Sequence, residues 1–133
     1  MAVAAATVAA LSSGTELFSI VLDHTPASET RDGIAKASAL PLGYSVVTAT
    51  SVLGNGSKVV SQDTVPFALW CVAKCFESYT ESMLTTVAGL GDRDTNCAIV
   101  GGILALRDQA GPIPDEWLLA REPFEELPRV TTA

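Results

Sequence analysis

The stretch that most constrains this chain covers residues 91–102 and reads Gly-Asp-Arg-Asp-Thr-Asn-Cys-Ala-Ile-Val-Gly-Gly. Two carboxylates, one hydroxyl and one amide lie within five residues, directly before an apolar segment. No other part of the chain places so many hard oxygen donors together. Such oxygens are the ligands that Mg²⁺ takes in proteins. The stretch predicts one half of a metal-centred hydrolase site.

Helix capping is the simpler explanation of Asp92 and Asp94, because Asp is a preferred N-cap and favours the positive end of the helix dipole. Two Asp with the adjacent Thr95 and Asn96 exceed what capping requires. The same helix N-terminus would help keep both carboxylates ionised, as metal ligation requires. An EF-hand loop starting at Asp92 is excluded, because Cys97 stands where that loop needs glycine.

Other function classes fit the sequence poorly. A phosphatase with an aspartyl nucleophile needs a later lysine, and none follows Lys74. A glycosyltransferase needs a nucleotide-binding α/β domain, and no strand–helix alternation is visible. The net charge is −7 with only eight scattered basic residues, whereas phosphate binding needs clustered Lys and Arg. We therefore expect no nucleic-acid partner.

Hydrophobic periodicity predicts a helical chain of 133 residues, a length that suits one domain. We expect helices over residues 2–11, 15–24, 28–39, from Ser61 to beyond Phe67, 79–90, 95–107 and from Asp115. The helix from Ser61 has the widest apolar face and is expected to be central, with Pro66 in its first turn. The helix over 79–90 is expected to point four side chains inward: Met83, Leu84, Val87 and Leu90.

Two segments have alternative interpretations. Residues 44–53 are rich in β-branched side chains, which favours a strand, but no partner strand is evident and we favour a helix. Residues 95–107 could form two strands joined at Gly101 and Gly102. In a helix these glycines would cost about 1 kcal/mol each, unless another element packs closely against them.

The cysteines and the N-terminal run bear on the cellular compartment. Cys71, Cys75 and Cys97 do not form a disulfide framework, and a zinc site would need further ligands, with His24 far away in sequence. We expect reduced thiols in a cytoplasmic protein. The apolar residues 1–11 have no preceding positive charge and are too short to span a bilayer, so we expect no membrane partner.

Gly54-Asn55-Gly56 is a strong turn signal. Glycine permits positive φ and a close approach of the backbone to a ligand. A plain turn between helices remains the alternative.

Residues 91–102 resemble the C-terminal metal motif of the ADP-ribosylglycohydrolase family, which runs Gly-Asp-x-Asp-Thr before a helix of small residues. Leu53-Gly54-Asn55-Gly56 with the segment from Asp63 to Trp70 resembles the preceding loop and helix of that family. Ile113-Pro114 with Trp117-Leu118 is similar to its closing segment. The resemblance covers residues 50–120 well and the first 50 loosely.

This resemblance implies an all-α fold, a compact orthogonal bundle of several helices, with a dinuclear Mg²⁺ site (Mn²⁺ in some members) that binds ADP-ribose. Asp92, Asp94 and Thr95 match metal ligands, and Asp94 matches the residue that bridges both ions and is the expected catalytic residue. Gly54, Asn55 and Gly56 would lie near the bound nucleotide. The implied reaction is hydrolysis at C1″ of ADP-ribose linked to a protein side chain or a related conjugate.

The sequence departs from the family in its first half. The family carries a second acidic motif, Thr-Asp-Asp-Thr-like, and an early acidic catalytic residue, and neither has a match. Asp63-Thr64 belongs to the later helix, and Asp23-His24-Thr25 lacks paired carboxylates. We therefore expect residues 1–133 to form one partial domain, the C-terminal part of the family domain with its N-terminal half missing.

Two functional hypotheses result. In the first, the chain is the C-terminal fragment of a metal-dependent hydrolase acting on ADP-ribosylated protein, with half the metal site and activity that depends on a separate N-terminal half. In the second, it is a non-catalytic helical fragment that binds a partner protein, self-associates or binds ADP-ribose weakly.

Overall fold

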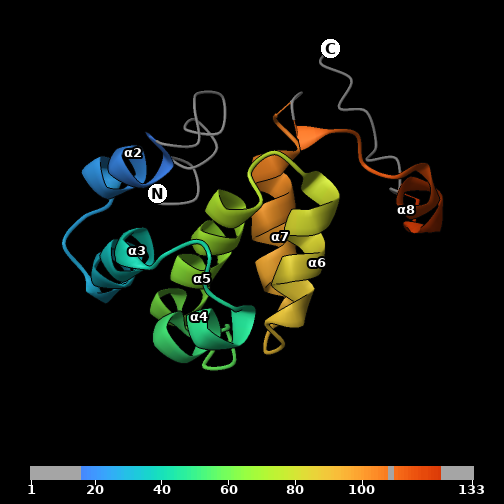
Figure 1. Cartoon of the computed structure of the whole chain (residues 1–133). Helices are drawn as coiled ribbons and strands as arrows, with labels where there is room; N and C mark the ends of the chain where they lie inside the picture. Colours follow the sequence, from blue (N-terminus) through green and yellow to red (C-terminus); the bar gives the residue numbers. More distant parts are fainter. Residues whose placement is uncertain (1–15, 108–109, 124–133) are drawn as a thin grey trace, which may run out of the picture.

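The computed structural model describes residues 16–107 and 110–123, and within them it contains seven helices and no strand (Figure 1). The expected all-α fold is confirmed. The helices are α2 (Leu17–His24), α3 (Glu29–Ala39), α4 (Val46–Leu53), α5 (Ser61–Lys74), α6 (Tyr79–Ala88), α7 (Arg93–Leu104) and α8 (Asp115–Ala120). The helix expected over residues 2–11 lies outside the described residues.

Helix α5 lies at the centre, with α3 and α4 on one side and α6 and α7 on the other (Figure 1). Every residue from Asp63 to Val72 is buried, so this helix has no solvent-facing side over that length. Phe67 and Trp70 are among the largest fully buried side chains. Burying a side chain such as Phe67 contributes about 1.5–3 kcal/mol. The expectation of a central buried helix is confirmed.

Local capping signals define where four of these helices begin. In each case a side-chain oxygen accepts the backbone N–H three residues later, and the capping residues are Ser28, Ser45, Ser78 and Asp92. This bond satisfies one of the amide groups that the first turn leaves unpaired. The cap at Ser45 explains why residues 46–53 are helical despite their β-branched side chains. The helical interpretation of this segment is confirmed.

Pro66 was expected in the first turn of its helix, and this expectation is wrong. Helix α5 begins at Ser61, so Pro66 is its sixth residue and lies inside the helix. Proline there cannot donate a backbone hydrogen bond to the preceding turn. Tertiary packing compensates, because the ring lies against the backbone of α3. A Cβ placed on Gly33 would come within 2.6 Å of Pro66 Cγ.

The inward face expected for α6 is also wrong. Three of the four side chains are exposed, namely Leu84, Val87 and Leu90, and Met83 is partly buried. The buried face instead carries Ser82 and Thr86. Ser82 Oγ donates to the carbonyl of Cys71 on α5 at 3.2 Å, and Thr86 Oγ1 donates to the carbonyl of Ser82 at 2.7 Å. Small hydroxyl side chains therefore replace the apolar stripe at this contact.

Helix α7 is continuous through Gly101 and Gly102, so the hairpin alternative is excluded. The two glycines differ in their surroundings. A Cβ on Gly101 would lie 2.9 Å from Tyr79 Oη and 3.4 Å from Met83 Sδ, both on α6. A Cβ on Gly102 would meet nothing within 4 Å. Close packing of α7 against α6 therefore explains why residue 101 is a glycine, and it does not explain the glycine at position 102.

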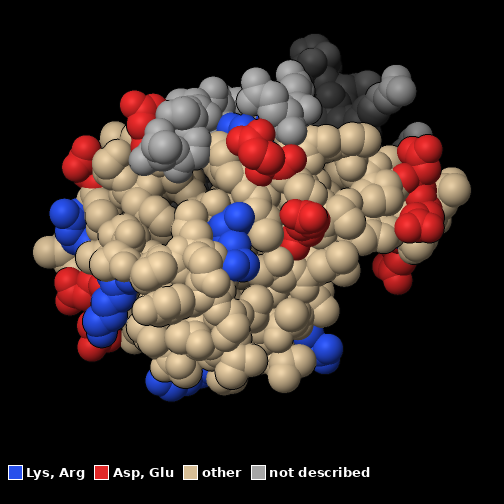
Figure 2. Space-filling model, in the orientation of Figure 1, with Lys and Arg blue, Asp and Glu red and all other residues tan. Residues whose placement is uncertain are grey.

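Charged side chains are spread thinly over the surface (Figure 2). Acidic residues gather at the α8 end of the view, where Asp115 and Glu116 are exposed. The same helix is anchored by Trp117, whose ring lies 6.4 Å from that of Tyr79 between centroids. Among the described residues no helix is long and apolar enough to cross a membrane.

All three cysteines are free thiols. Cys71 is buried on α5, and burial raises the pKa of its thiol to about 12, so the group is neutral at physiological pH. Within the described part of the chain, no group of three or more His, Cys, Asp or Glu side chains could hold a metal ion.

The glycine pair in α7 gives a matched stability test. We expect Gly102→Ala to raise the free energy of unfolding by up to about 1 kcal/mol, because alanine restricts the unfolded chain and meets open space. We expect Gly101→Ala to lower it by about 1 kcal/mol, because overpacking against Tyr79 exceeds that gain. Urea denaturation of both variants checks this, and equal effects would contradict the packing difference.

Candidate metal centre

Two segments far apart in the sequence meet at the N-terminus of α7. One is the glycine turn (Gly54, Asn55 and Gly56), and the other is the acidic segment (residues 91–95). The carbonyl of Asn55 accepts two hydrogen bonds, from the backbone N–H of Asp92 at 3.1 Å and from Asn96 Nδ2 at 2.8 Å. The side chain of Asn55 donates to the carbonyl of Gly89 at 3.1 Å. The structure therefore brings together residues that the sequence places about forty positions apart.

Glycine is required on both sides of this contact. Gly91 has φ +63°, and a Cβ there would collide with the side chain and carbonyl of Asn55. Gly56 has φ +89°, and a Cβ there would lie 2.8 Å from Asp92 Cβ and 3.2 Å from Asn96 Nδ2. Positive φ and lack of space each disfavour a larger residue. The close backbone approach expected at the glycine turn is thus made to the acidic segment, and its contact with a nucleotide stays a prediction.

Asp63 holds the glycine turn and the residues after it through hydrogen bonds. Its side chain is buried, and its Oδ2 accepts the backbone N–H of Lys58 at 2.9 Å. Its carbonyl accepts the N–H of Gly56 at 3.0 Å. The sequence indicated Asp63 as part of a helix start and of the segment that resembles the family, without a role for its side chain. The available signal was a carboxylate in the first turn of a mainly apolar helix, seven residues after Gly56.

The three predicted ligands lie at the start of α7. Asp92 is the N-cap and is partly buried, and its Oδ1 accepts the N–H of Thr95 at 3.3 Å. Asp94 and Thr95 are exposed in the first turn. Capping therefore accounts for Asp92 and leaves Asp94 without a capping role.

The neighbouring side chain of Asp94, followed by the side chain and the backbone N–H of Thr95, lowers the pKa of the Asp92 carboxyl below its ordinary value. Hydrogen bonds to the charged form stabilise it, so Asp92 is ionised at neutral pH.

The donor set fits part of a magnesium shell. Two carboxylates and one hydroxyl are hard oxygen donors of the kind Mg²⁺ prefers, and Mg²⁺ commonly keeps several waters. Two nearby carboxylates also repel each other when both are ionised, and a cation between them would remove that repulsion. A dinuclear site would need more ligands than these, because the described residues supply no third acidic, His or Cys side chain to the group.

The sequence indicated Asn96 only as a neighbour of the acidic residues, and in the structure its side chain is buried. Its side chain is fully buried in α7, with Nδ2 bonded to Asn55. Its Oδ1 has no hydrogen-bond partner among the described residues. An unsatisfied buried acceptor costs about 1–3 kcal/mol. No periodicity rule marks such a residue, because its role depends on a loop that is distant in sequence.

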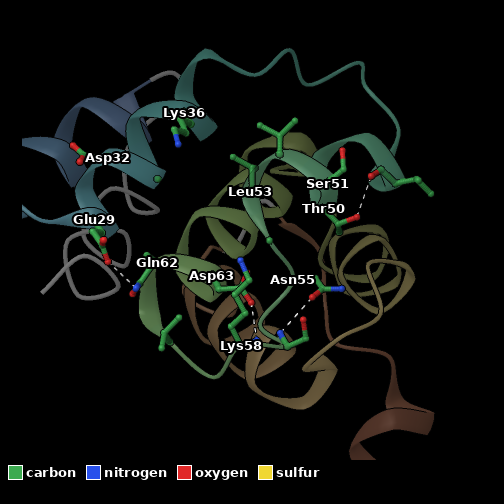
Figure 3. A pocket seen from close by; sticks show the side chains of 16 residues that line it. Glu29, Asp32, Lys36, Thr50, Ser51, Leu53, Asn55, Lys58, Gln62 and Asp63 are labelled. Carbon is green, nitrogen blue, oxygen red and sulfur yellow. Dashed lines mark hydrogen bonds between the residues drawn. The ribbon is translucent and has the colours of Figure 1, made fainter.

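A groove of about 860 Å³ lies beside the glycine turn (Figure 3). It is formed by α3, α4, the glycine turn and the start of α5. Gly54, Asn55 and Asp63 line it, whereas Asp92, Asp94 and Thr95 do not. The predicted metal ligands therefore lie outside the groove, whereas two residues of the glycine turn line it.

Gly91 and Leu90 test the loop contact. Both are exposed and have positive φ, +63° at Gly91 and +57° at Leu90, but a Cβ at Gly91 would also collide with Asn55. We expect Gly91→Ala to lower the free energy of unfolding by about 2 kcal/mol or more, because it adds left-handed strain and a collision with Asn55. We expect Leu90→Gly to raise it by up to about 1 kcal/mol, because only strain is relieved. Denaturant unfolding checks both, and a neutral Gly91→Ala would contradict the close contact.

Asp92 gives a test against pH. Its folded-state pKa lies below the ordinary value of 3.8, so its contribution to stability is complete above that value and is lost as pH falls through the lower folded pKa. Asp92→Asn keeps a capping acceptor but cannot titrate. We expect the variant to lose the part of the acid-side pH dependence of the melting temperature that Asp92 contributes, with no change of slope above about pH 5. Carbon NMR titration measures the pKa directly, and a value at or above 3.8 would contradict the hydrogen-bonded pair.

Comparison with known proteins supplies the family. A family model described as ADP-ribosylglycohydrolase matches residues 1–132. No curated protein and no solved structure matches the sequence. The match spans nearly the whole chain and includes the acidic segment, the glycine turn and α5. This chain therefore belongs to the ADP-ribosylglycohydrolase family.

Proposed function

We propose that the chain serves metal-dependent hydrolysis that removes ADP-ribose from modified protein side chains or related conjugates. Family membership supports hydrolase activity of the ADP-ribosylglycohydrolase type in general. The observation that carries the specific proposal is the position of Asp92, Asp94 and Thr95, three oxygen donors on one helix N-terminus held against the glycine turn.

The proposed cofactor is Mg²⁺, with two ions in the complete site and Mn²⁺ as a substitute. Asp94 is the proposed catalytic residue because its carboxylate is exposed, has no capping role and neighbours that of Asp92. A divalent cation held between these two carboxylates would offset the repulsion between their charges. Thr95 would add its hydroxyl, and Asp92 would contribute a carboxylate whose lowered pKa keeps it ionised.

When bound, the cations would orient the ribose hydroxyls and stabilise charge that develops at C1″. The residues of this chain would position the cations and the bound substrate. The N-terminus of α7 favours negative charge from the acidic residues, and the glycine turn presents backbone beside them. We propose that Gly54, Asn55 and Gly56 lie near the nucleotide, with Gly54 and Asn55, which line the groove, available for contact.

A complete dinuclear site needs carboxylates that the described residues do not bring to α7. We propose that an N-terminal half of the family domain supplies them in trans and that the chain is inactive alone. The free thiols support action in the cytoplasm.

A second candidate is a non-catalytic helical module that binds a partner protein, a second copy or ADP-ribose. The observation in its favour is the row of exposed apolar side chains on and after α6, namely Leu84, Val87 and Leu90. Exposed apolar rows often mark interaction surfaces.

Activity measurements with two matched substitutions decide between these functions. The chain is offered ADP-ribosylated protein and Mg²⁺, alone and with the N-terminal half of a family domain. We expect hydrolysis in the combined sample, and Asp94→Asn should lower its rate by at least about 100-fold, because charge stabilisation of several kcal/mol is lost.

Asp115→Asn is the control, because it removes the same charge from an exposed position on α8. It should leave the rate unchanged. Full activity of Asp94→Asn would exclude the proposed catalytic role. Binding of ADP-ribose without hydrolysis in any combination would favour the non-catalytic module.

A further inference from the structure

We propose that Asn55 and Asn96 are positioning residues that hold the acidic segment in the geometry required for cation binding. This inference rests on the proposed function, because it gives the acidic segment a cation to bind. It adds two residues that contribute no atom to the cation and act through the backbone of Asp92. The pair is called the asparagine latch below.

The latch is built around one peptide carbonyl. The oxygen of Asn55 accepts the N–H of Asp92 and the amide of Asn96, so it joins a main-chain group before α7 to a side chain within α7. The side chain of Asn55 then reaches the carbonyl of Gly89, on the other side of the sharp turn at Leu90 and Gly91. The latch therefore forms hydrogen bonds on both sides of the acidic segment, to Gly89 before it and through Asn96 after it.

The backbone that the latch holds has little stability of its own. Leu90 and Gly91 both have positive φ, a conformation that costs a leucine energy and that persists only where surrounding contacts maintain it. The carboxylates of Asp92 and Asp94 follow directly and tend to repel each other when ionised. Without the latch, the segment is free to relax and to separate the two donors.

The unpaired oxygen of Asn96 indicates that this side chain positions the acidic segment rather than adding to the free energy of unfolding. The side chain is fully buried, makes one hydrogen bond through Nδ2 and leaves Oδ1 without a partner among the described residues. Leucine has the same branched arrangement of side-chain heavy atoms and would bury no unsatisfied oxygen, although its methyl groups take more room. Its substitution would leave the carbonyl of Asn55 still paired with Asp92. Asn96→Leu therefore removes the latch bond without leaving a buried polar group unpaired, and the Asn55→Ala variant tests the latch without adding volume.

The test compares Asn96→Leu with Ser82→Ala. Ser82 also donates from a fully buried side chain to a backbone carbonyl, but that carbonyl belongs to Cys71 on α5. The first measurement is amide hydrogen exchange by NMR at Asp92 and Thr95. The second is Mn²⁺ binding to the full chain, followed by loss of the free-ion electron paramagnetic resonance signal, with Asp94→Asn as the ligand control.

We expect Asn96→Leu to speed exchange at Asp92 and Thr95 about tenfold or more and to raise the Mn²⁺ dissociation constant by about 10–100-fold, the range found when residues that orient metal ligands are removed. Asn55→Ala, which keeps the carbonyl but loses the bond to Gly89, should shift both values in the same direction. Ser82→Ala should change neither, whatever its effect on melting temperature.

Two failures are distinguishable. If wild type binds Mn²⁺ and Asp94→Asn does not, while Asn96→Leu binds and exchanges like wild type, the latch is overturned and the proposed function stands. If wild type shows no saturable Mn²⁺ binding even with the N-terminal half of a family domain, the proposed metal site fails and the latch falls with it.

Discussion

The burial of α5 on every side is the constraint on which the rest of the structure depends. A helix with no solvent-facing surface from Asp63 to Val72 must be covered by neighbours all round, and α3, α4, α6 and α7 do so. Because α5 and α7 pack together, the segments that precede them meet at one end of the pair. The contact between the glycine turn and the acidic segment is thus a consequence of how the core is filled.

Backbone strain and one unsatisfied buried oxygen lie at that contact. Val59 and Leu90 are non-glycine residues with positive φ, and one follows the glycine turn while the other precedes the acidic segment. Asn96, with its unpaired Oδ1, lies between the two segments. Local departures from favourable geometry of this kind concentrate at functional sites, where surrounding packing maintains them. Both described non-glycine residues with positive φ, together with this oxygen, thus lie beside the segments that the proposed function uses.

The two wrong expectations have a common physical origin. Hydrophobicity placed Leu84 and Val87 inward on α6, but the neighbouring α5 already carries bulky aromatic side chains, and Ser82 and Thr86 fit the remaining space. Pro66 lies inside α5 because Gly33 on α3 makes room for its ring. In both cases the outcome depended on the volume available at a partner helix, which no single segment encodes.

By itself, the sequence determined the all-α class, most helix starts, the central place of α5 and the acidic segment as the main candidate site. These follow from local rules, since capping side chains such as Ser45 and Asp92 act within one turn and apolar breadth sets burial. Only the tertiary structure decided that Asn96 donates a hydrogen bond to Asn55 and that Asp63 accepts one from the loop after the glycine turn. The packing of Gly101 against Tyr79 was also decided at that level. Such contacts link residues many positions apart, and they arise only when packed helices bring their ends together.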